Sequence, residues 1–436
     1  MIEVIATLLR WLQLASNMIL VGSCVFLAIA GSFHSPWVPR LQRALPWLGL
    51  VLLAGLLGIL ATTTAQATGI AGNAWRPDAW LALMQNTRMG QIWVARTVLA
   101  LLAAGLALSI RYAPAARWRY LLCAGVATLT LVAGSLASHS AAEELSVLSI
   151  LPYALHIILA SVWFGALPAF LVICFDCTRP HAQAARPGIQ TEAIARIHGL
   201  FQSREQAVQS GAQALKRFSV MALPVMLGVI ATGILITDRM VDTSYAAMVS
   251  TEYGWLLNAK VALLCVVLVI AARARSTWLP LLGAAPARDP ASNPAPNPSP
   301  SPNPARDPAQ NPAQDPEGAA GGKLRRWVSF EFVLALGIVL LATIVANTVP
   351  AKHAIIQNWP YSFRFSLAAT WGEPGVMLRV WTGLALLILA GGAVALGRTR
   401  QWRTQWRIAL PTALAAAALA VGLPPLAIDA YPETYR

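Results

Sequence analysis

Residues 152–175 of the chain read PYALHIILASVWFGALPAFLVICF and contain no aspartate, glutamate, lysine or arginine. An α-helix rises about 1.5 Å per residue, so a segment of this length can cross the roughly 30 Å hydrocarbon core of a bilayer. Comparable apolar runs recur along the chain, and they lack the alternating pattern of membrane β-barrel strands. The sequence therefore predicts an all-α, polytopic helical membrane protein.

The composition supports this class. Of 436 residues, 57% are hydrophobic and only 11% are charged, whereas soluble domains carry roughly 25% charged residues. A soluble enzyme, a disordered chain and a fibrous chain are excluded. The net charge of +14 does not indicate nucleic-acid binding, because the basic residues lie in short loops between apolar runs. The five cysteines are scattered and predict no disulfide framework.

Ten membrane spans are predicted, at about 11–31, 46–68, 90–110, 118–137, 152–175, 218–237, 254–273, 327–347, 376–396 and 407–427. The first has no signal-peptide features and is expected to remain as a helix. Loops after the odd-numbered spans, together with the adjoining span ends, hold 22 of the 32 basic residues. Because short cytoplasmic loops are enriched in lysine and arginine, odd-numbered spans are predicted to end in the cytoplasm. Both termini are then periplasmic.

Three regions are predicted. Residues 1–140 form a first four-helix unit and residues 141–350 a second one. Residues 351–436 hold an outer loop with a histidine and a Trp-Pro pair, followed by two C-terminal helices. A proline-rich stretch at about 284–322 is expected to be a disordered cytoplasmic tether. Since no G-x-x-x-x-G-K-[ST] motif occurs, nothing indicates an ATP-driven pump.

An internal repeat links the two four-helix units. The sequence ATGI at residues 67–70 recurs at 231–234, an offset of 164 residues. At the same offset, the T-x-x-G motif at 87–90 matches 251–254, and Arg96 matches Lys260. Since four spans separate the copies, the two units are predicted to be parallel repeats with the same membrane orientation.

Histidine gives the clearest functional signal, because a ring nitrogen near the membrane face needs a hydrogen-bonding partner or a metal. His139 and His156 flank the short connection between the fourth and fifth spans, and His353 lies at the equivalent exit of the second unit. These three are predicted metal ligands on the outer side, with imidazole suited to copper, zinc, iron or nickel. The alternative for each is an interfacial histidine bonded to water.

Sulfur ligands extend this hypothesis. Methionine is concentrated on the predicted outer side, where a thioether can bind Cu(I). The first candidate is Met89, and further candidates along a metal path are Met18, Met84, Met240, Met248 and Met377. Packing is the alternative for any single methionine. A C-x-x-C motif, Cys174 to Cys177, is either a soft-metal exit site at the cytoplasmic end of the fifth span or two packing residues.

Three of the charged residues inside predicted spans are functional candidates. Arg96 and Lys260 are expected to share a structural role, or to extend toward the headgroups. Glu331 is either an ion-path carboxylate or, as the favoured interpretation, a partner of Arg325 or Arg326. Catalytic triads, paired catalytic carboxylates and H-E-x-x-H motifs cannot be placed, so an enzyme is not expected.

Four segments resemble the copper resistance protein D family. They are ALHIILASVWFGALPAFLV (154–172), with Trp163 in its W-x-G motif, KRFSVMALPVMLGVIATGILITDRM (216–240), STEYGWLLNAKVALL (250–264) and VPAKHAIIQNWPYSFRF (349–365). The resemblance implies copper handling in the bacterial inner membrane, with His139 and His156 contacting the metal and His353 next. The final AIDAYPETYR is similar to a junction that precedes a periplasmic cytochrome c domain in longer relatives.

The leading expectation is a copper transporter or delivery protein, with copper ions captured outside by His and Met and passed inward. A periplasmic copper chaperone or cytochrome c is the expected partner. The alternative is a membrane cytochrome with histidine pairs that ligate haem b. Covalent c-type haem is not expected, because no C-x-x-C-H motif occurs. If copper is held by His139 and His156, their ligating nitrogens should lie within ~4 Å in the loaded protein.

Overall fold

The computed structural model describes residues 2–30, 35, 37–112, 116–136, 147–178, 190–241, 247–277, 316–351, 363–365, 367–399 and 404–429. Within these residues, nine helices are long and apolar enough to cross a membrane. They are α1 (Ile2–Ala30), α2 (Val38–Thr68), α4 (Arg88–Tyr112), α5 (Arg117–Ser135), α7 (Val147–Thr178), α8 (Gln190–Val241), α10 (Glu252–Thr277), α11 (Pro316–Val345) and α13 (Val376–Thr399). Helix α14 (Thr404–Gly422) covers most of the tenth predicted span. The all-α polytopic class is confirmed.

Short elements connect some of these helices. They are η1 (Ala71–Trp75), α3 (Pro77–Asn86), α9 (Ala247–Ser250), β1 (Phe363–Phe365), α12 (Leu367–Thr370), η4 (Pro424–Leu426) and β2 (Ala427–Asp429). The two strands pair antiparallel, with Phe363 opposite Asp429 and Phe365 opposite Ala427. This small ribbon was not expected from the sequence. The proline-rich stretch at 284–322 lies mostly outside the described residues, so its predicted role as a tether is untested.

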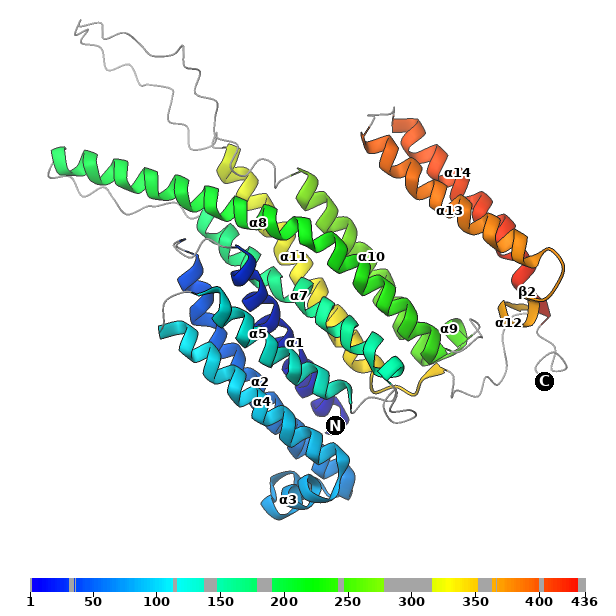
Figure 1. The fold of residues 1–436 in the computed structure, drawn as a ribbon, viewed down its shortest axis with the longest axis horizontal. Coiled ribbons are helices and arrows are strands. Elements are labelled where there is room, and N and C mark those ends of the chain that lie inside the picture. Colours follow the sequence, from blue (N-terminus) through cyan, green and yellow to red (C-terminus); the bar gives the residue numbers. More distant parts are fainter. Residues whose placement is uncertain are drawn as a thin grey trace, which may run out of the picture. The chain divides into compact units, whose positions relative to one another are not determined.

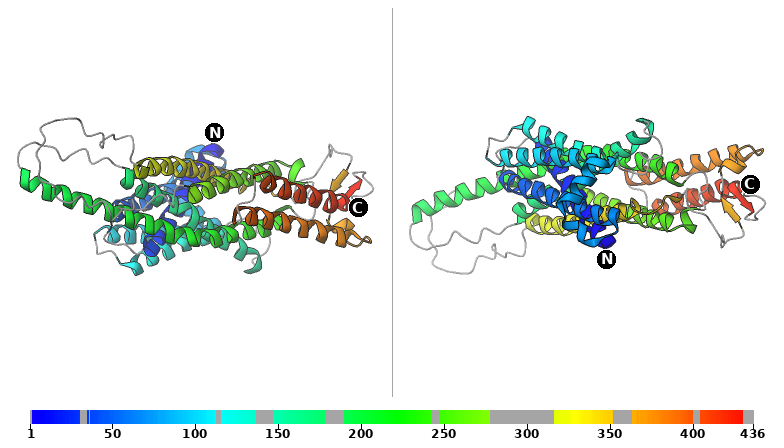
Figure 2. Two further views of the ribbon diagram at one scale, coloured as in Figure 1. Left: turned by 90° about the horizontal axis from the view of Figure 1, so that it is seen from above. Right: turned by 90° about the horizontal axis from the view of Figure 1, so that it is seen from below.

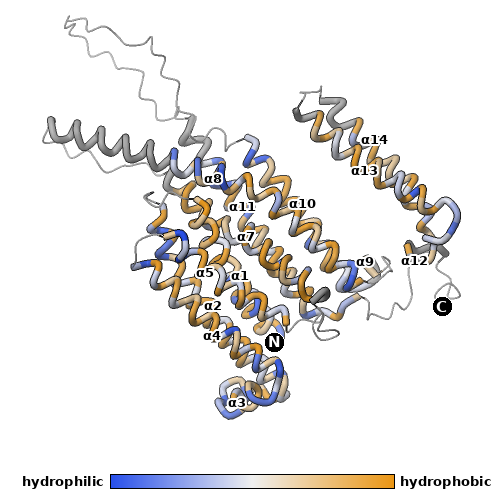
Figure 3. Tube along the Cα trace, in the orientation of Figure 1, coloured by the Kyte–Doolittle hydropathy of each residue, from blue (hydrophilic) through white to orange (hydrophobic). Residues whose placement is uncertain are grey.

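The outer surfaces of the helices are apolar, as a lipid environment requires. Figure 3 shows hydrophobic residues along most of the helix lengths and hydrophilic residues concentrated near the helix ends. Large apolar side chains such as Leu101 and Val269 are 56% and 68% exposed. Contiguous apolar surface of this extent is rare in soluble monomers. These faces are therefore interpreted as the surface that contacts lipid tails.

The chain forms two compact units. One comprises residues 1–233 and 261–343, and the other comprises residues 234–260 and 344–436. The first unit includes helices from both predicted four-helix units. The predicted domain boundaries and the superposition of the repeats stay predictions.

In the first unit, α1 packs against α2, α5 and α7, as Figures 1 and 2 show. Two glycines bring α1 and α7 into backbone contact. A Cβ atom added to Gly22 would lie 2.5 Å from the Gly165 backbone, and Ser23 donates a hydrogen bond to the Gly165 carbonyl at 3.0 Å. Glycine is needed at this crossing because any side chain would separate the helices. The W-x-G motif thus supplies a packing surface next to the buried Trp163.

The repeated T-x-x-G motif has the same local structure in both copies. Thr87 precedes α4 and Thr251 precedes α10, and each hydroxyl accepts the N–H of the glycine three residues later, at 2.9 and 3.0 Å. Each hydroxyl also donates to a carbonyl four residues earlier. Both threonines are therefore N-caps of the following helix. Each glycine accommodates the backbone of the preceding short helix, at Met84 or Met248.

Candidate functional site

His156 is held between two helices of the first unit. Its ring lies on α7, and its Nδ1 atom is 3.0 Å from both the Val229 carbonyl oxygen and the Thr232 hydroxyl of α8. The side chain is partly buried. His156 lies nine residues after the start of α7, about 14 Å along the axis. Because α7 begins five residues before the predicted span at 152, His156 still lies only four residues into that span.

The hydrogen-bonding partners determine the tautomer of the neutral ring. A carbonyl oxygen only accepts hydrogen bonds, so Nδ1 must be the donor toward Val229. The Thr232 hydroxyl donates to the Gly228 carbonyl at 2.6 Å, which leaves its oxygen to accept from the same Nδ1–H. The lone pair of the neutral imidazole then resides on Nε2. Metal-ligating histidines commonly have this arrangement, in which one nitrogen donates to the protein and the other carries the lone pair.

The second copy of the ATGI repeat forms part of this setting. A Cβ atom added to Gly233 would lie 3.4 Å from Cε1 of His156, so glycine leaves room for the ring. The first copy differs, because Gly69 ends α2 with φ = 70° and Thr68 bonds within its own helix. The second copy of the repeat therefore contacts the His156 side chain from α8, whereas the first copy forms the C-terminal end of α2.

The other predicted histidine ligands cannot be placed. His139 and His353 lie outside the described residues, as do His34 and His181. The expected approach of His139 to His156 is therefore untested. In the part of the chain that the structure describes, no three His, Cys, Asp or Glu residues form a group suited to a metal ion.

The candidate methionines are dispersed among different environments. Met18 is 4% exposed in the middle of α1, and Met240 is buried in an apolar cluster with Tyr253. Met89 and Met377 are about half exposed, each at the second position of a helix. Met84 and Met248 are partly buried beside the two capping motifs. For Met18 and Met240, burial agrees with the packing interpretation.

Arg96 turns into the protein interior. Its guanidinium donates a hydrogen bond to the Gln13 side chain of α1 at 2.8 Å and lies against Gly134 of α5. Extension toward the headgroups, one alternative from the sequence, therefore does not occur. Several nearby buried polar atoms have no hydrogen-bond partner among the described residues, namely Arg96 Nε, Gln13 Nε2 and both polar atoms of the Asn17 amide. Lys260, its counterpart in the repeat, is partly buried in α10.

Sequence analysis did not identify two further buried contacts. Cys24 in α1 lies beside Cys123 in α5, whose thiol donates to the Ala103 carbonyl at 3.6 Å, and both cysteines are fully buried. Glu331 faces Arg275 rather than Arg325 or Arg326, and Arg325 instead lies over the Phe175 ring at 4.7 Å. Both contacts join helices that are distant in sequence, so no local motif could have predicted them. Cys174 is buried, and the side chain of Cys177 is outside the described set.

A bundle of apolar helices with polar groups turned inward defines a multi-pass integral membrane protein. The chain belongs to the copper resistance protein D family. Residues 1–149 match the model of the copper resistance protein D-like N-terminal domain, and residues 212–345 match that of copper resistance protein D. The chain is 28% identical to the inner membrane protein YebZ of Escherichia coli (strain K12) over 284 residues, which cover 62% of this chain and 83% of YebZ. No solved structure matches the chain.

Proposed function

We propose that this protein moves copper ions across the bacterial inner membrane, or delivers them there, with His156 as a ligand on the path. The observation that carries the proposal is the ring geometry of His156. Its Nδ1–H is engaged by Val229 and Thr232, and this places the lone pair on Nε2. Membership of a copper resistance family makes copper the metal to test first.

The remaining parts of the proposal follow from the sequence. His139 and His353 are proposed as outer-side ligands, with Met89 as a soft thioether donor. A periplasmic copper chaperone is proposed as the donor of the ion, and both termini are proposed to be periplasmic. Haem b is the competing proposal for the cofactor of these histidines, and a Soret band in the purified protein would favour it.

Copper transport tests this proposal directly. The purified chain is reconstituted into liposomes, Cu(I) is supplied outside, and internal copper is measured after removal of external metal. We expect uptake above that of protein-free liposomes, and a large loss in His156→Ala. The matched control is Thr130→Val, which removes a buried helix hydroxyl in α5. Uptake equal to that of protein-free liposomes would exclude transport, and an unchanged His156→Ala rate would exclude His156.

A further inference from the structure

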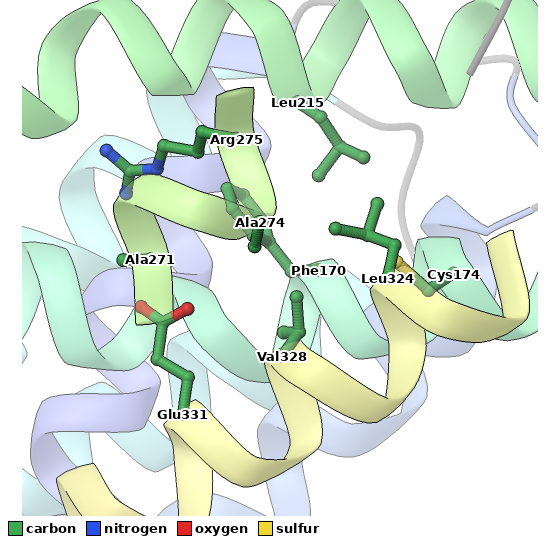
Figure 4. A pocket seen from close by; sticks show the side chains of 9 residues that line it. All are labelled: Phe170, Cys174, Leu215, Ala271, Ala274, Arg275, Leu324, Val328 and Glu331. Carbon is green, nitrogen blue, oxygen red and sulfur yellow. The ribbon is translucent and has the colours of Figure 1, made fainter. Parts of the chain in front are cut away.

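A small cavity lies inside the first unit, between α7, α8, α10 and α11. Its volume is about 20 Å³, and its walls include Phe170, Cys174, Leu215, Arg275, Val328 and Glu331. A cavity of roughly 10–15 Å³ on this measure is enough for one water molecule. Figure 4 shows the Glu331 carboxylate pointing from α11 toward α10, with Cys174 on the other side of the cavity. The cavity is therefore the size of one water molecule and has a carboxylate in its wall.

Glu331 is unusually placed for a charged residue. The side chain is 3% exposed, and its Oε1 atom has no hydrogen-bond partner among the described residues. Burial of an ionised carboxylate is costly unless its oxygens are paired. Protonation relieves that cost by making the group neutral. Ionisable residues inside membrane spans are rare and commonly mark ion or proton pathways.

A charged group at the cavity partly opposes the preference of the buried carboxylate for its neutral form. Arg275 of α10 is the cation that interacts with Glu331, although the two form no direct ion pair in the described part of the chain. From α7, the titratable group on the cavity is the Cys174 thiol, and α8 contributes the apolar Leu215. Arg275 favours the ionised carboxylate, while burial favours the neutral acid. The carboxylate is thus subject to two opposing influences, from its burial and from Arg275.

We propose that Glu331 is a reversible proton-binding site, and that its protonation is coupled to copper movement through the bundle. A proton from water bonds to one carboxylate oxygen to give a neutral acid, and the same O–H bond breaks on release. Electrons are not transferred, and Arg275 balances the negative charge of the ionised state. The Cys174 thiol is a soft donor in the cavity wall, but the guanidinium there repels a cation and the carboxylate is a hard ligand, so the cavity suits a proton better than Cu(I).

Infrared difference spectroscopy tests the proton site without any need for copper. The full chain in membranes is acidified stepwise, and the C=O stretch of protonated carboxylic acids is followed. We expect a band that disappears in Glu331→Gln and persists in Glu373→Gln, which removes an exposed carboxylate. A full wild-type band in Glu331→Gln would refute the assignment.

The variant Arg275→Gln provides a second infrared test of the proton site in case Glu331→Gln does not fold. Arg275→Gln removes the cation that favours the ionised carboxylate. The infrared band should therefore form at a higher pH than in the wild type. If the infrared band of Arg275→Gln forms at the same pH as in the wild type, Arg275 does not act on this carboxylate. That result would contradict the proposed site.

The coupling, which rests on the proposed copper function, has its own measurement. Proteoliposomes containing a trapped pH dye are given Cu(I) under an imposed pH gradient. In the wild type, the gradient should change the rate of copper uptake and copper should move protons. In Glu331→Gln, uptake should no longer respond to the gradient.

Equal responses of the two proteins to the gradient would refute coupling. If the wild type binds Cu(I) and Glu331→Gln does not, Glu331 is a copper ligand instead. Absence of all copper uptake with an intact infrared band would refute the copper function alone.

Discussion

At the residue scale, the most informative contact is the one between His156 and Thr232. The Thr232 hydroxyl oxygen lies 3.0 Å from Nδ1 of His156 and orients the imidazole. In the proposed copper site, Thr232 would not itself bind the metal. Loss of such an outer partner commonly costs 10–100-fold in metal affinity. Thr232→Val should therefore weaken copper binding by about 10-fold, as measured by competition with a chromophoric Cu(I) chelator. Thr130→Val is the control, and equal affinity in both variants would show that Thr232 does not orient a ligand.

The sequence predicted which residues to inspect at this scale, but not their partners. His156, Arg96 and Glu331 stood out because polar groups are rare in apolar spans. Their partners Val229, Gln13 and Arg275 lie on other helices, and apolar periodicity carries no information about which helices meet. The start of α7 was missed for a similar reason, because the helix begins five residues before the apolar span that predicted it.

At the element scale, the crossing of α1 and α7 depends on Gly22 and Gly165. Addition of one methyl group at Gly22 would place it 2.5 Å from backbone atoms of α7, so the helices must separate. Gly22→Ala should destabilise the protein by about 1–3 kcal/mol, as overpacked cores do. Thermal unfolding in detergent measures this. Gly125→Ala is the matched control, since a Cβ there meets nothing within 4 Å. A stability of Gly22→Ala equal to or above that of the control would contradict the close crossing.

The two T-x-x-G motifs give a second prediction for helix elements. Thr87→Ala and Thr251→Ala each remove a hydroxyl that caps a helix N-terminus. Each should lower stability by about 1 kcal/mol, again measured by thermal unfolding. Thr97→Ala removes a hydroxyl bonded within α4 and should cost less. If only one of the two capping variants is destabilised, the motifs are not equivalent.

Hydropathy predicted the helices better than it predicted their ends. Nine predicted spans fall on long apolar helices, because each must bury roughly 20 residues in lipid. Helix α8 begins at Gln190, well before the apolar span at 218, because polar residues can continue a helix outside the membrane. The short α3 and α9 were missed, since neither carries a membrane-length apolar run.

At the scale of the whole molecule, the orientation rests on the asymmetry of basic residues. A reporter fused at residue 300 should be active as a cytoplasmic fusion, and one placed after Arg436 should be active as a periplasmic fusion. The reason is that 22 of the 32 lysines and arginines lie on one predicted side. Paired alkaline phosphatase and fluorescent protein fusions measure this. A reversed result at either position would overturn the topology and the assignment of an outer capture site.

The central claim is that the protein binds copper through outer-side histidines, and copper content measures it most directly. The wild type and the His139→Ala/His156→Ala variant are loaded with Cu(I), passed through a desalting column, and analysed for metal per protein. Stoichiometric copper is expected in the wild type, and a clear loss of copper is expected in the double variant. Copper binding should also weaken in acid, because protonated imidazole cannot ligate. Full copper in the double variant would contradict the placement of the site, and absence of copper in the folded wild type would contradict the function.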